Sequence, residues 1–348
     1  MPVEGGPIPF ESQSDKATMN TRIPRPALAA LLPLTATAML VANEQPANAT
    51  AATPAWPAHF AAPYLQIGPG TAGDMADDMA TTGLRHYTLA FLIPQDGCTA
   101  KWEFNGDPVG AFSSEINALK ANGGDVIISF GGAAGGELAQ TCTSVSDLTA
   151  AYANIVNTYG VTRLDFDIEG ATLDDTAANT RRNQALAALQ AQNPSVQVDY
   201  TLAVAPDGLP SAQTQLLQDA KNNGVNVSTV NLMTMDFGDG HNALADAESA
   251  AQATAQQLAN IYGVSNSQAY QMMGLTPIAG KNDDDEIFSQ SDAVALENFA
   301  ASNGVQELSF WEVDGYDKPT GYAYSNTFNQ ISTAQGPNVG ARTPRTAH

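Results

Sequence analysis

The chain has 348 residues, 43% of them hydrophobic, which is enough for one large domain or two ordinary ones. It carries 36 Asp and Glu residues against 14 Lys and Arg residues, so its net charge is −22. Such an acidic surface repels nucleic acids and anionic membranes, and neither is expected as a partner. The composition suits a protein that acts on a neutral substrate.

The N-terminal region has the pattern of a secretory signal. A short basic stretch at 19–25 precedes an apolar run at 27–42, and 47–49 (Ala-Asn-Ala) is a small-x-small cleavage site. The apolar run is too short and too rich in Ala and Thr to span a membrane. We therefore expect a signal peptide over residues 1–49, with Met19 as an alternative start, and a secreted protein that has no membrane contact after cleavage. A buried N-terminal helix is the alternative, which a proline inside the run would interrupt.

Residues 61–333 alternate regularly between strand-like and helix-like segments. The predicted strands are 63–68, 86–93, 125–132, 163–169, 198–205, 229–237, 271–279 and 307–313. The predicted helices are 111–122, 145–159, 176–193, 211–222, 245–262 and 292–303. Ser144, Asp175 and Ser291 are the predicted N-caps. We expect residues 50–60 to form a linker and residues 334–348 a disordered tail.

Eight strands that alternate with helices over about 270 residues match the size of a (β/α)8 barrel. The alternative is an open doubly wound sheet, which often has a Gly-rich phosphate loop after its first strand. Here that loop is 68–73, and its Pro69 lacks an N–H that phosphate binding would need. We therefore expect an α/β fold, a single (β/α)8 TIM barrel over residues 61–333. Its active site should lie at the C-terminal ends of the strands.

Two cysteines, Cys98 and Cys142, remain in the mature chain. An even number of cysteines in an exported protein favours a disulfide. The two residues follow the second and third predicted strands, so in a barrel their loops are neighbours on one face. We expect a bridge between them, and two unrelated buried thiols are the alternative.

Residues 164–170 (Leu-Asp-Phe-Asp-Ile-Glu-Gly) alternate between apolar and acidic side chains. In a strand, Asp165, Asp167 and Glu169 share one face, with neighbours about 6 to 7 Å apart. Like charges at this spacing raise one another's pKa, so at least one carboxyl is expected to hold a proton near neutral pH. The pattern favours acid–base catalysis. Structural ion pairs and a divalent-metal site are the alternatives, although basic residues are few and no ligand set has clear spacing.

These residues belong to a wider resemblance. Residues 165–169 resemble the DxDxE signature of the family-18 glycoside hydrolases, the chitinase family. Residues 129–132 (Ser-Phe-Gly-Gly) resemble its SxGG motif, and 231–236 (Asn-Leu-Met-Thr-Met-Asp) resemble its Met-x-Tyr-Asp motif. Trp311 looks like the tryptophan that floors the sugar site, and the loop 280–286 looks like that of a bacterial and archaeal subgroup of chitinases.

The resemblance implies a chitinase that cleaves chitin or chito-oligosaccharides with net retention, and needs no metal or cofactor. Glu169 would be the general acid and base, Asp167 would orient the substrate's acetamido group, and Asp165 would share a proton with Asp167. The expected substrate contacts are Asp236, Trp311, Met235, Tyr64 and Tyr200. The expected structural residues at the site are Ser129, Gly131 and Gly132. The protein is expected to be a monomer.

One position departs from the family pattern. Met235 stands where the family has the tyrosine that hydrogen-bonds the acetamido group, while the following Asp236 is kept. Tyr200 and Tyr270 are the candidates to replace the missing hydroxyl. Two other functions stay open: an endo-β-N-acetylglucosaminidase that acts on N-glycans, and an inactive chitin-binding lectin. Lectins of the family typically lose the acidic glutamate, whereas Glu169 is present.

Overall fold

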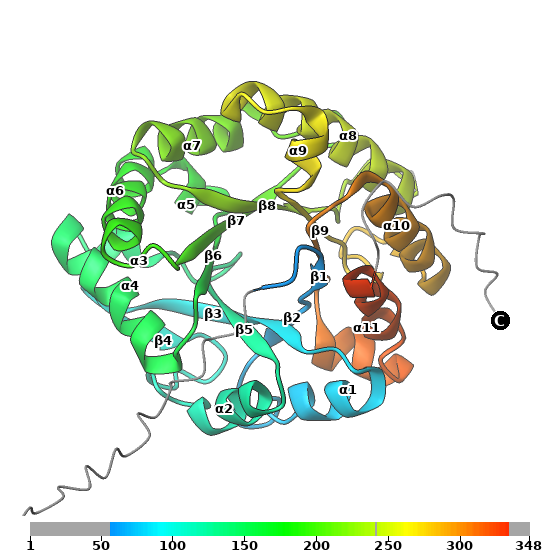
Figure 1. Ribbon diagram of the computed structural model, residues 1–348, viewed down its shortest axis with the longest axis horizontal. Helices are drawn as coiled ribbons and strands as arrows, with labels where there is room; N and C mark the ends of the chain where they lie inside the picture. Colours follow the sequence, from blue (N-terminus) through cyan, green and yellow to red (C-terminus); the bar gives the residue numbers. More distant parts are fainter. Residues whose placement is uncertain (1–55, 241, 334–348) are drawn as a thin grey trace, which may run out of the picture. The chain divides into compact units, whose positions relative to one another are not determined.

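The computed structural model describes residues 56–240 and 242–333, which form a barrel of parallel strands inside a ring of helices (Figure 1). The predicted signal peptide at 1–49 and the predicted tail at 334–348 lie outside the described residues. Within the described part, no helix is long and apolar enough to cross a membrane.

The parallel sheet closes on itself through a first strand that is split in two. β1 (Phe60–Ala61) pairs with β12 (Glu307–Leu308), whereas β2 (Tyr64–Gln66) pairs with β3 (His86–Asp96). Pro63 lies between the two pieces and has no N–H to donate to either neighbour. The other barrel strands are β5 (Asp125–Gly131), β6 (Arg163–Asp167), β7 (Gln197–Ala203), β8 (Val227–Met233) and β9 (Met273–Thr276). The predicted (β/α)8 barrel is confirmed.

Six helices lie where the sequence pattern predicted them: α2 (Ser113–Ala121), α4 (Val145–Tyr159), α6 (Thr176–Gln192), α7 (Ser211–Asn222), α8 (Ala243–Tyr262) and α10 (Gln290–Asn303). Ser144 caps α4 and Asp175 caps α6, as predicted. The prediction of Ser291 as the cap of α10 is wrong. Ser289 is the cap, because it forms a capping box with Asp292.

The sequence pattern does not reveal α1 (Asp74–Thr82), because Asp74 and Asp78 occupy part of its buried side. Asp74 pairs with Lys318 at 2.7 Å, and Asp78 accepts from Ser325 Oγ at 2.8 Å. Polar residues thus stand where an apolar stripe would mark a helix. The other unpredicted elements are short: β4 (Thr99–Trp102), α3 (Leu138–Thr141), α5 (Gly170–Asp174), α9 (Asn266–Tyr270), β10 (Gly280–Lys281), β11 (Ile287–Phe288), η1 (Val313–Asp317), η2 (Lys318–Thr320), α11 (Ala323–Phe328) and η3 (Asn329–Thr333).

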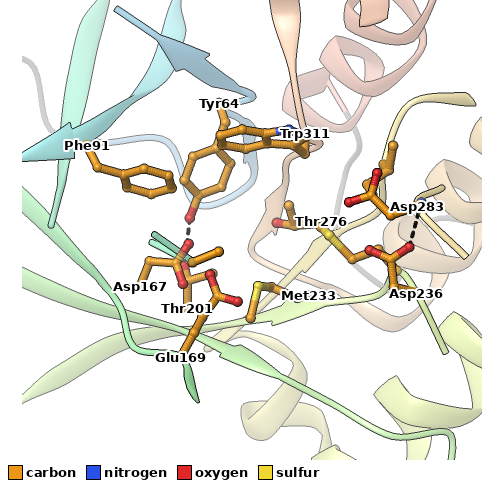
Figure 2. Close-up of a pocket in the computed structure, with 13 residues that line it drawn as sticks. Tyr64, Phe91, Asp167, Glu169, Thr201, Met233, Asp236, Thr276, Asp283 and Trp311 are labelled. Carbon is orange, nitrogen blue, oxygen red and sulfur yellow. Dashed lines mark hydrogen bonds between the residues drawn. The ribbon is translucent and has the colours of Figure 1, made fainter. Parts of the chain in front are cut away.

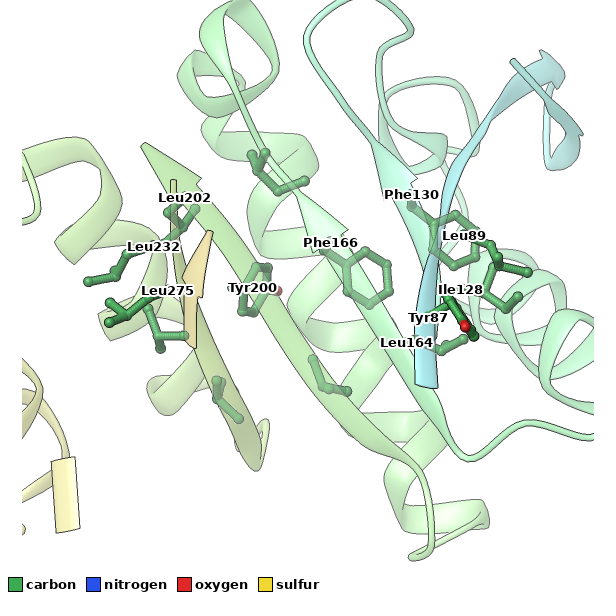
Figure 3. Packing of buried hydrophobic residues seen from close by; sticks show 14 of the residues in the cluster. Tyr87, Leu89, Ile128, Phe130, Leu164, Phe166, Tyr200, Leu202, Leu232 and Leu275 are labelled. Carbon is green, nitrogen blue, oxygen red and sulfur yellow. The ribbon is translucent and has the colours of Figure 1, made fainter. Parts of the chain in front are cut away.

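The apolar face of the acidic strand β6 packs outward against helices. Leu164, Phe166 and Ile168 are fully buried. The ring of Phe166 stacks on Phe130 of β5 with centroids 5.2 Å apart (Figure 3), and Tyr152 of α4 meets both rings edge-on. Since neighbours on a strand point to opposite faces, the acidic residues between them face the barrel interior.

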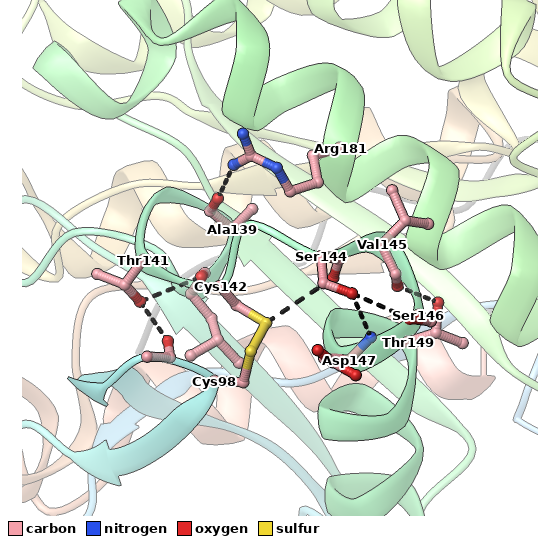
Figure 4. Close-up of a disulfide and its surroundings, with 12 residues drawn as sticks. Cys98, Ala139, Thr141, Cys142, Ser144, Val145, Ser146, Asp147, Thr149 and Arg181 are labelled. Atoms are coloured by element: carbon pink, nitrogen blue, oxygen red, sulfur yellow. Dashed lines mark hydrogen bonds between the residues drawn. A yellow bond between two sulfur atoms is a disulfide. The ribbon is translucent and has the colours of Figure 1, made fainter.

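Cys98 and Cys142 form the predicted disulfide (Figure 4). Cys98 lies in the turn between β3 and β4, and Cys142 directly follows α3, so the bond joins the loops after the second and third barrel strands. Beside it, Thr141 Oγ1 donates to Gly97 O at 2.6 Å. The bridge links residues 44 positions apart and so restricts the rim of the barrel mouth.

Candidate active site

A pocket opens at the C-terminal ends of the barrel strands, where barrel enzymes have their active sites (Figure 2). Its volume of about 250 Å³ is slightly below the roughly 300–1,000 Å³ of ligand pockets and suits one sugar ring. The lining residues are Tyr64, Phe91, Ala133, Asp167, Glu169, Thr201, Met233, Met235, Asp236, Thr276, Ile278, Asp283 and Trp311.

Asp165 lies beneath this pocket, buried among hydroxyl groups. Its Oδ2 accepts from Tyr64 at 2.9 Å and from Ser129 at 2.6 Å, and its Oδ1 accepts from Thr201 at 2.7 Å. Burial raises the pKa of Asp165 to about 7, although the bonds from Ser129 and Thr201 oppose the rise. The hydrogen bonds of Asp165 come from hydroxyl groups and not from Asp167. Asp165 therefore acts on Asp167 through its charge.

Asp167 and Glu169 line the pocket. Asp167 is only 4% exposed, and its Oδ1 has no hydrogen-bond partner among the described residues. Burial, followed by the charges of Glu169 and Asp165, raises the pKa of Asp167 well above its usual value. Burial also raises the pKa of the half-buried Glu169, while a hydrogen bond with Asp167 lowers it. The three acids therefore form a row from the barrel floor to its mouth, and the pKa of each is raised.

Three aromatic side chains form one wall of the pocket. Phe91 and Trp311 stack with centroids 5.7 Å apart and an interplanar angle of 10°. The ring of Tyr64 lies 5.9 Å from that of Trp311, and its hydroxyl points towards the acids and meets Thr201 (Figure 2). The same hydroxyl donates to Asp165. Tyr64 and Trp311 thus lie in the pocket, where the apolar face of a ring-shaped ligand can pack against them.

Met235 and Asp236 also line the pocket. Asp236 adopts a φ of 50°, and its Oδ1 accepts the backbone N–H groups of Asp283 at 2.8 Å and Asp284 at 3.2 Å. Asp236 thereby fixes the acidic loop that follows β9. Among the described residues, no group of three or more His, Cys, Asp or Glu side chains is placed to hold a metal ion.

Tyr200 does not reach the pocket, which corrects the prediction that it contacts the substrate. Its side chain points outward from β7, and its hydroxyl donates to Asn183 of α6. The next residue, Thr201, lines the pocket instead, because consecutive strand residues face opposite sides. Tyr270 lies on α9 and is not part of the lining. Within the described chain, Tyr64 is the only tyrosine that lines this pocket.

Comparison with known proteins agrees with this geometry. The family model described as "Glycosyl hydrolases family 18" matches residues 65–330, which cover the barrel. The chain belongs to glycosyl hydrolases family 18. It is therefore a glycoside hydrolase by family.

Two curated proteins are similar to this family 18 chain. The "Probable bifunctional chitinase/lysozyme" of Escherichia coli (strain K12) is 34% identical over 305 residues, which cover 81% of this chain and 34% of that protein. "Endochitinase 11" of Metarhizium anisopliae is 34% identical over 275 residues, which cover 74% of this chain and 53% of that protein. The chain thus spans about a third and about half of the length of these relatives.

Solved structures of family 18 chitinases share the fold. The catalytic domain of a hyperthermophilic chitinase from Pyrococcus furiosus matches with a TM-score of 0.73 and 31% identity, over 80% of this chain and 96% of that one. A putative chitinase A from Streptomyces coelicolor matches with a TM-score of 0.58, over 80% of this chain and 99% of that one. Its identity is 17%, so that likeness bears on the fold alone.

Two glycines let the strand next to the acids approach closely. Gly131 pairs with Asp167 and has a φ of 100°, and a Cβ at this position would lie 2.1 Å from the carbonyl oxygen of Asp167. Gly132 has a φ of 82°, and a Cβ there would lie 2.6 Å from the ring of Phe91. Because only glycine fits both the space and the backbone conformation, these residues hold the backbone of Asp167 in place.

Gly131→Ala is expected to destabilise the fold by about 1–3 kcal/mol through overpacking, with left-handed strain of about 1 kcal/mol added. The measurement is the midpoint of urea unfolding. Gly70→Ala is the matched control, since a Cβ at Gly70 meets nothing within 4 Å. Equal midpoints for the two variants would contradict this account of the close approach.

Sequence reasoning did not single out several pocket residues: Phe91, Ala133, Thr201, Thr276 and Ile278. Each lies in a predicted strand or directly after one, on the side that faces the barrel axis. The signal that could have found them is position near a strand end, because the barrel brings all of these ends together. Asp283 belongs to the loop 280–286, and the bond from its backbone N–H to Asp236 shows that this loop folds back to the pocket.

Proposed function

We propose that this family 18 protein is a chitinase that hydrolyses β-1,4-linked N-acetylglucosamine by substrate-assisted, retaining catalysis. One arrangement carries the proposal: Glu169 at the pocket mouth with a raised pKa, next to Asp167, whose buried Oδ1 has no partner in the described part of the chain. A carboxyl that holds its proton can protonate a leaving oxygen. A buried acceptor without a partner can take the N–H of an acetamido group.

In the first step, Glu169 donates its proton to the glycosidic oxygen as the bond from that oxygen to the anomeric carbon breaks. The carbonyl oxygen of the substrate's N-acetyl group attacks the anomeric carbon from the other face and forms a cyclic oxazolinium ion. Asp167 accepts the acetamido N–H and stabilises the positive charge. In the second step, the Glu169 carboxylate takes a proton from water, and the water oxygen attacks the anomeric carbon and opens the oxazolinium ring. The configuration of the anomeric carbon is inverted in each step, so it is retained overall.

The wall of Tyr64, Phe91 and Trp311 supports a sugar in this position, because the C–H face of a pyranose packs on aromatic rings while its polar groups reach the acids. Relatives named as chitinase/lysozyme and endochitinase support the same substrate class. The presence of Glu169 speaks against an inactive lectin. An endo-β-N-acetylglucosaminidase would use the same chemistry and is the nearest alternative.

N-acetylated chito-oligosaccharides are expected to be cleaved at least roughly 10³-fold faster than de-N-acetylated or cellulose oligomers of equal length, because only the acetamido group supplies the intramolecular nucleophile. The measurement is product analysis by mass spectrometry, with the first anomer followed by NMR. Glu169→Gln protein purified in parallel controls for contaminating enzymes. Efficient cleavage of cellulose oligomers would exclude the mechanism, and preferential release of N-glycans would favour the alternative enzyme.

We also propose that the protein is exported and acts as a monomer outside the cell. The basic, apolar and small-x-small pattern before residue 50 supports export. The bond between Cys98 and Cys142 supports it too, because disulfides persist in oxidising compartments.

A further inference from the structure

Asn231 of β8 joins the pocket wall to the buried floor of the barrel. It is 2% exposed and lies between Thr201 of β7 and Gly274 of β9. Its Nδ2 donates to Thr201 Oγ1 at 3.1 Å, and its Oδ1 accepts from Thr276 Oγ1 at 2.7 Å. Gly274 makes the room, since a Cβ there would lie 2.6 Å from Asn231 Oδ1. The amide is thus held between two hydroxyls, one of them next to the acids.

The amide of Asn231 decides where the hydroxyl proton of Thr201 points. A threonine hydroxyl has one proton to donate and lone pairs to accept with. Because Nδ2 of Asn231 can only donate, Thr201 Oγ1 accepts from it and must direct its own proton elsewhere. Asp165 Oδ1 lies 2.7 Å away, and the hydroxyl of Tyr64 lies 2.8 Å away with Asp165 Oδ2 as a second partner at 2.9 Å. The carboxylate is the stronger acceptor, so the proton of Thr201 goes to Asp165.

The charge of Asp165 is set by a balance of neighbours on several strands. Arg163 of β6 favours its anionic form by attraction. Burial opposes the anion, and so do the charges of Asp199 on β7, Glu307 on β12 and Asp167 on β6. In such a balance, one oriented hydroxyl changes how strongly the carboxyl holds a proton.

We propose that Asn231 is a positioning residue that directs the hydroxyl proton of Thr201 onto Asp165 and so weakens the hold of that carboxyl on a proton. Asn231 itself does not line the pocket. It acts on the pocket through Asp165, whose negative charge raises the pKa of Asp167. The effect on turnover rests on the proposed function, whereas the effect on Asp165 does not.

The test is a carboxyl ¹³C NMR titration of aspartate-labelled protein without substrate, with the Asp165 signal assigned from an Asp165→Asn variant. In Asn231→Leu, the titration midpoint of Asp165 is expected to rise by about half to one pH unit, because the carboxylate loses an oriented donor. In Thr276→Val, which leaves the amide of Asn231 without its anchor, a smaller rise is expected. Asn183→Leu is the matched control. Asn183 is also fully buried, but it binds Tyr200 and Asp219 on the helix side, so its loss leaves the Asp165 midpoint unchanged.

On N-acetylated chito-oligosaccharides, the acidic limb of the kcat/KM profile of Asn231→Leu should move to higher pH by the same amount, while Asn183→Leu keeps the wild-type profile. If Asn231 had a purely structural role, Asn231→Leu and Thr276→Val would lower the unfolding temperature, but the pH profile of kcat/KM would stay where it is in the wild type. The proposal is overturned if the titration midpoint of Asp165 in Asn231→Leu and in Thr276→Val equals that of the wild type. If Asn231→Leu fails to fold, the midpoint in Thr276→Val decides alone. If the wild-type protein had no hydrolytic activity, the proposed function would be contradicted. The NMR titration would still decide whether Asn231 acts on Asp165.

Discussion

Glu169→Gln is expected to lower kcat on N-acetylated chito-oligosaccharides by about 10²–10⁴-fold with the fold intact. Glutamine has almost the same shape, but it cannot protonate the leaving oxygen or take a proton from water. The substitution should cost little stability, because Glu169 is half-buried and makes no side-chain cap bond to α5.

Steady-state kinetics together with thermal unfolding measures this effect. Glu115→Gln on α2 is the control and is expected to keep wild-type turnover, since Glu115 lies outside the pocket and accepts a bond from its neighbour Ser114. Wild-type turnover in Glu169→Gln would remove Glu169 from the reaction and with it the proposed mechanism.

Asp167→Asn is expected to lower kcat by about 10²-fold while KM changes less, because Asp167 acts on charge that develops in the transition state. Asparagine carries no negative charge to stabilise the oxazolinium ion. The same change should not reduce stability. The pKa of Asp167 is raised in the folded state, so the native protein loses stability as pH rises towards that pKa, and a neutral amide escapes this loss.

Unfolding by urea at pH 5 and at pH 8, with kinetics at both, tests the two halves of this expectation. The stability of Asp167→Asn relative to wild type should be greater at pH 8 than at pH 5, while its activity is low at both. Asp174→Asn, an exposed carboxyl on α5, is the control and should match wild type in both measurements. A variant that keeps wild-type kcat would show that the pocket does not need the charge of Asp167.

Local patterns predicted most of the fold, for reasons that are visible in particular residues. The bounds of α4 and α7 follow from apolar spacing that agrees with burial in the barrel, and the caps Ser144 and Asp175 satisfy N–H groups within their own helices. Prediction failed at α1, where the buried positions are filled by aspartates whose partners lie more than two hundred residues away. No local pattern can report a partner at that distance.

The sequence by itself determined the row of three acids and its direction, because alternation with a period of two is a local property of the chain. The sequence also predicted that Cys98 and Cys142 would meet, because they follow consecutive strands of the predicted barrel. Only the tertiary structure decided what surrounds the acids. Closure of the barrel brings Tyr64 and Thr201 from two separate strands to Asp165, and Asn231 from a third strand to Thr201. On β7, Tyr200 points outward to the helices and its neighbour Thr201 points inward to the pocket.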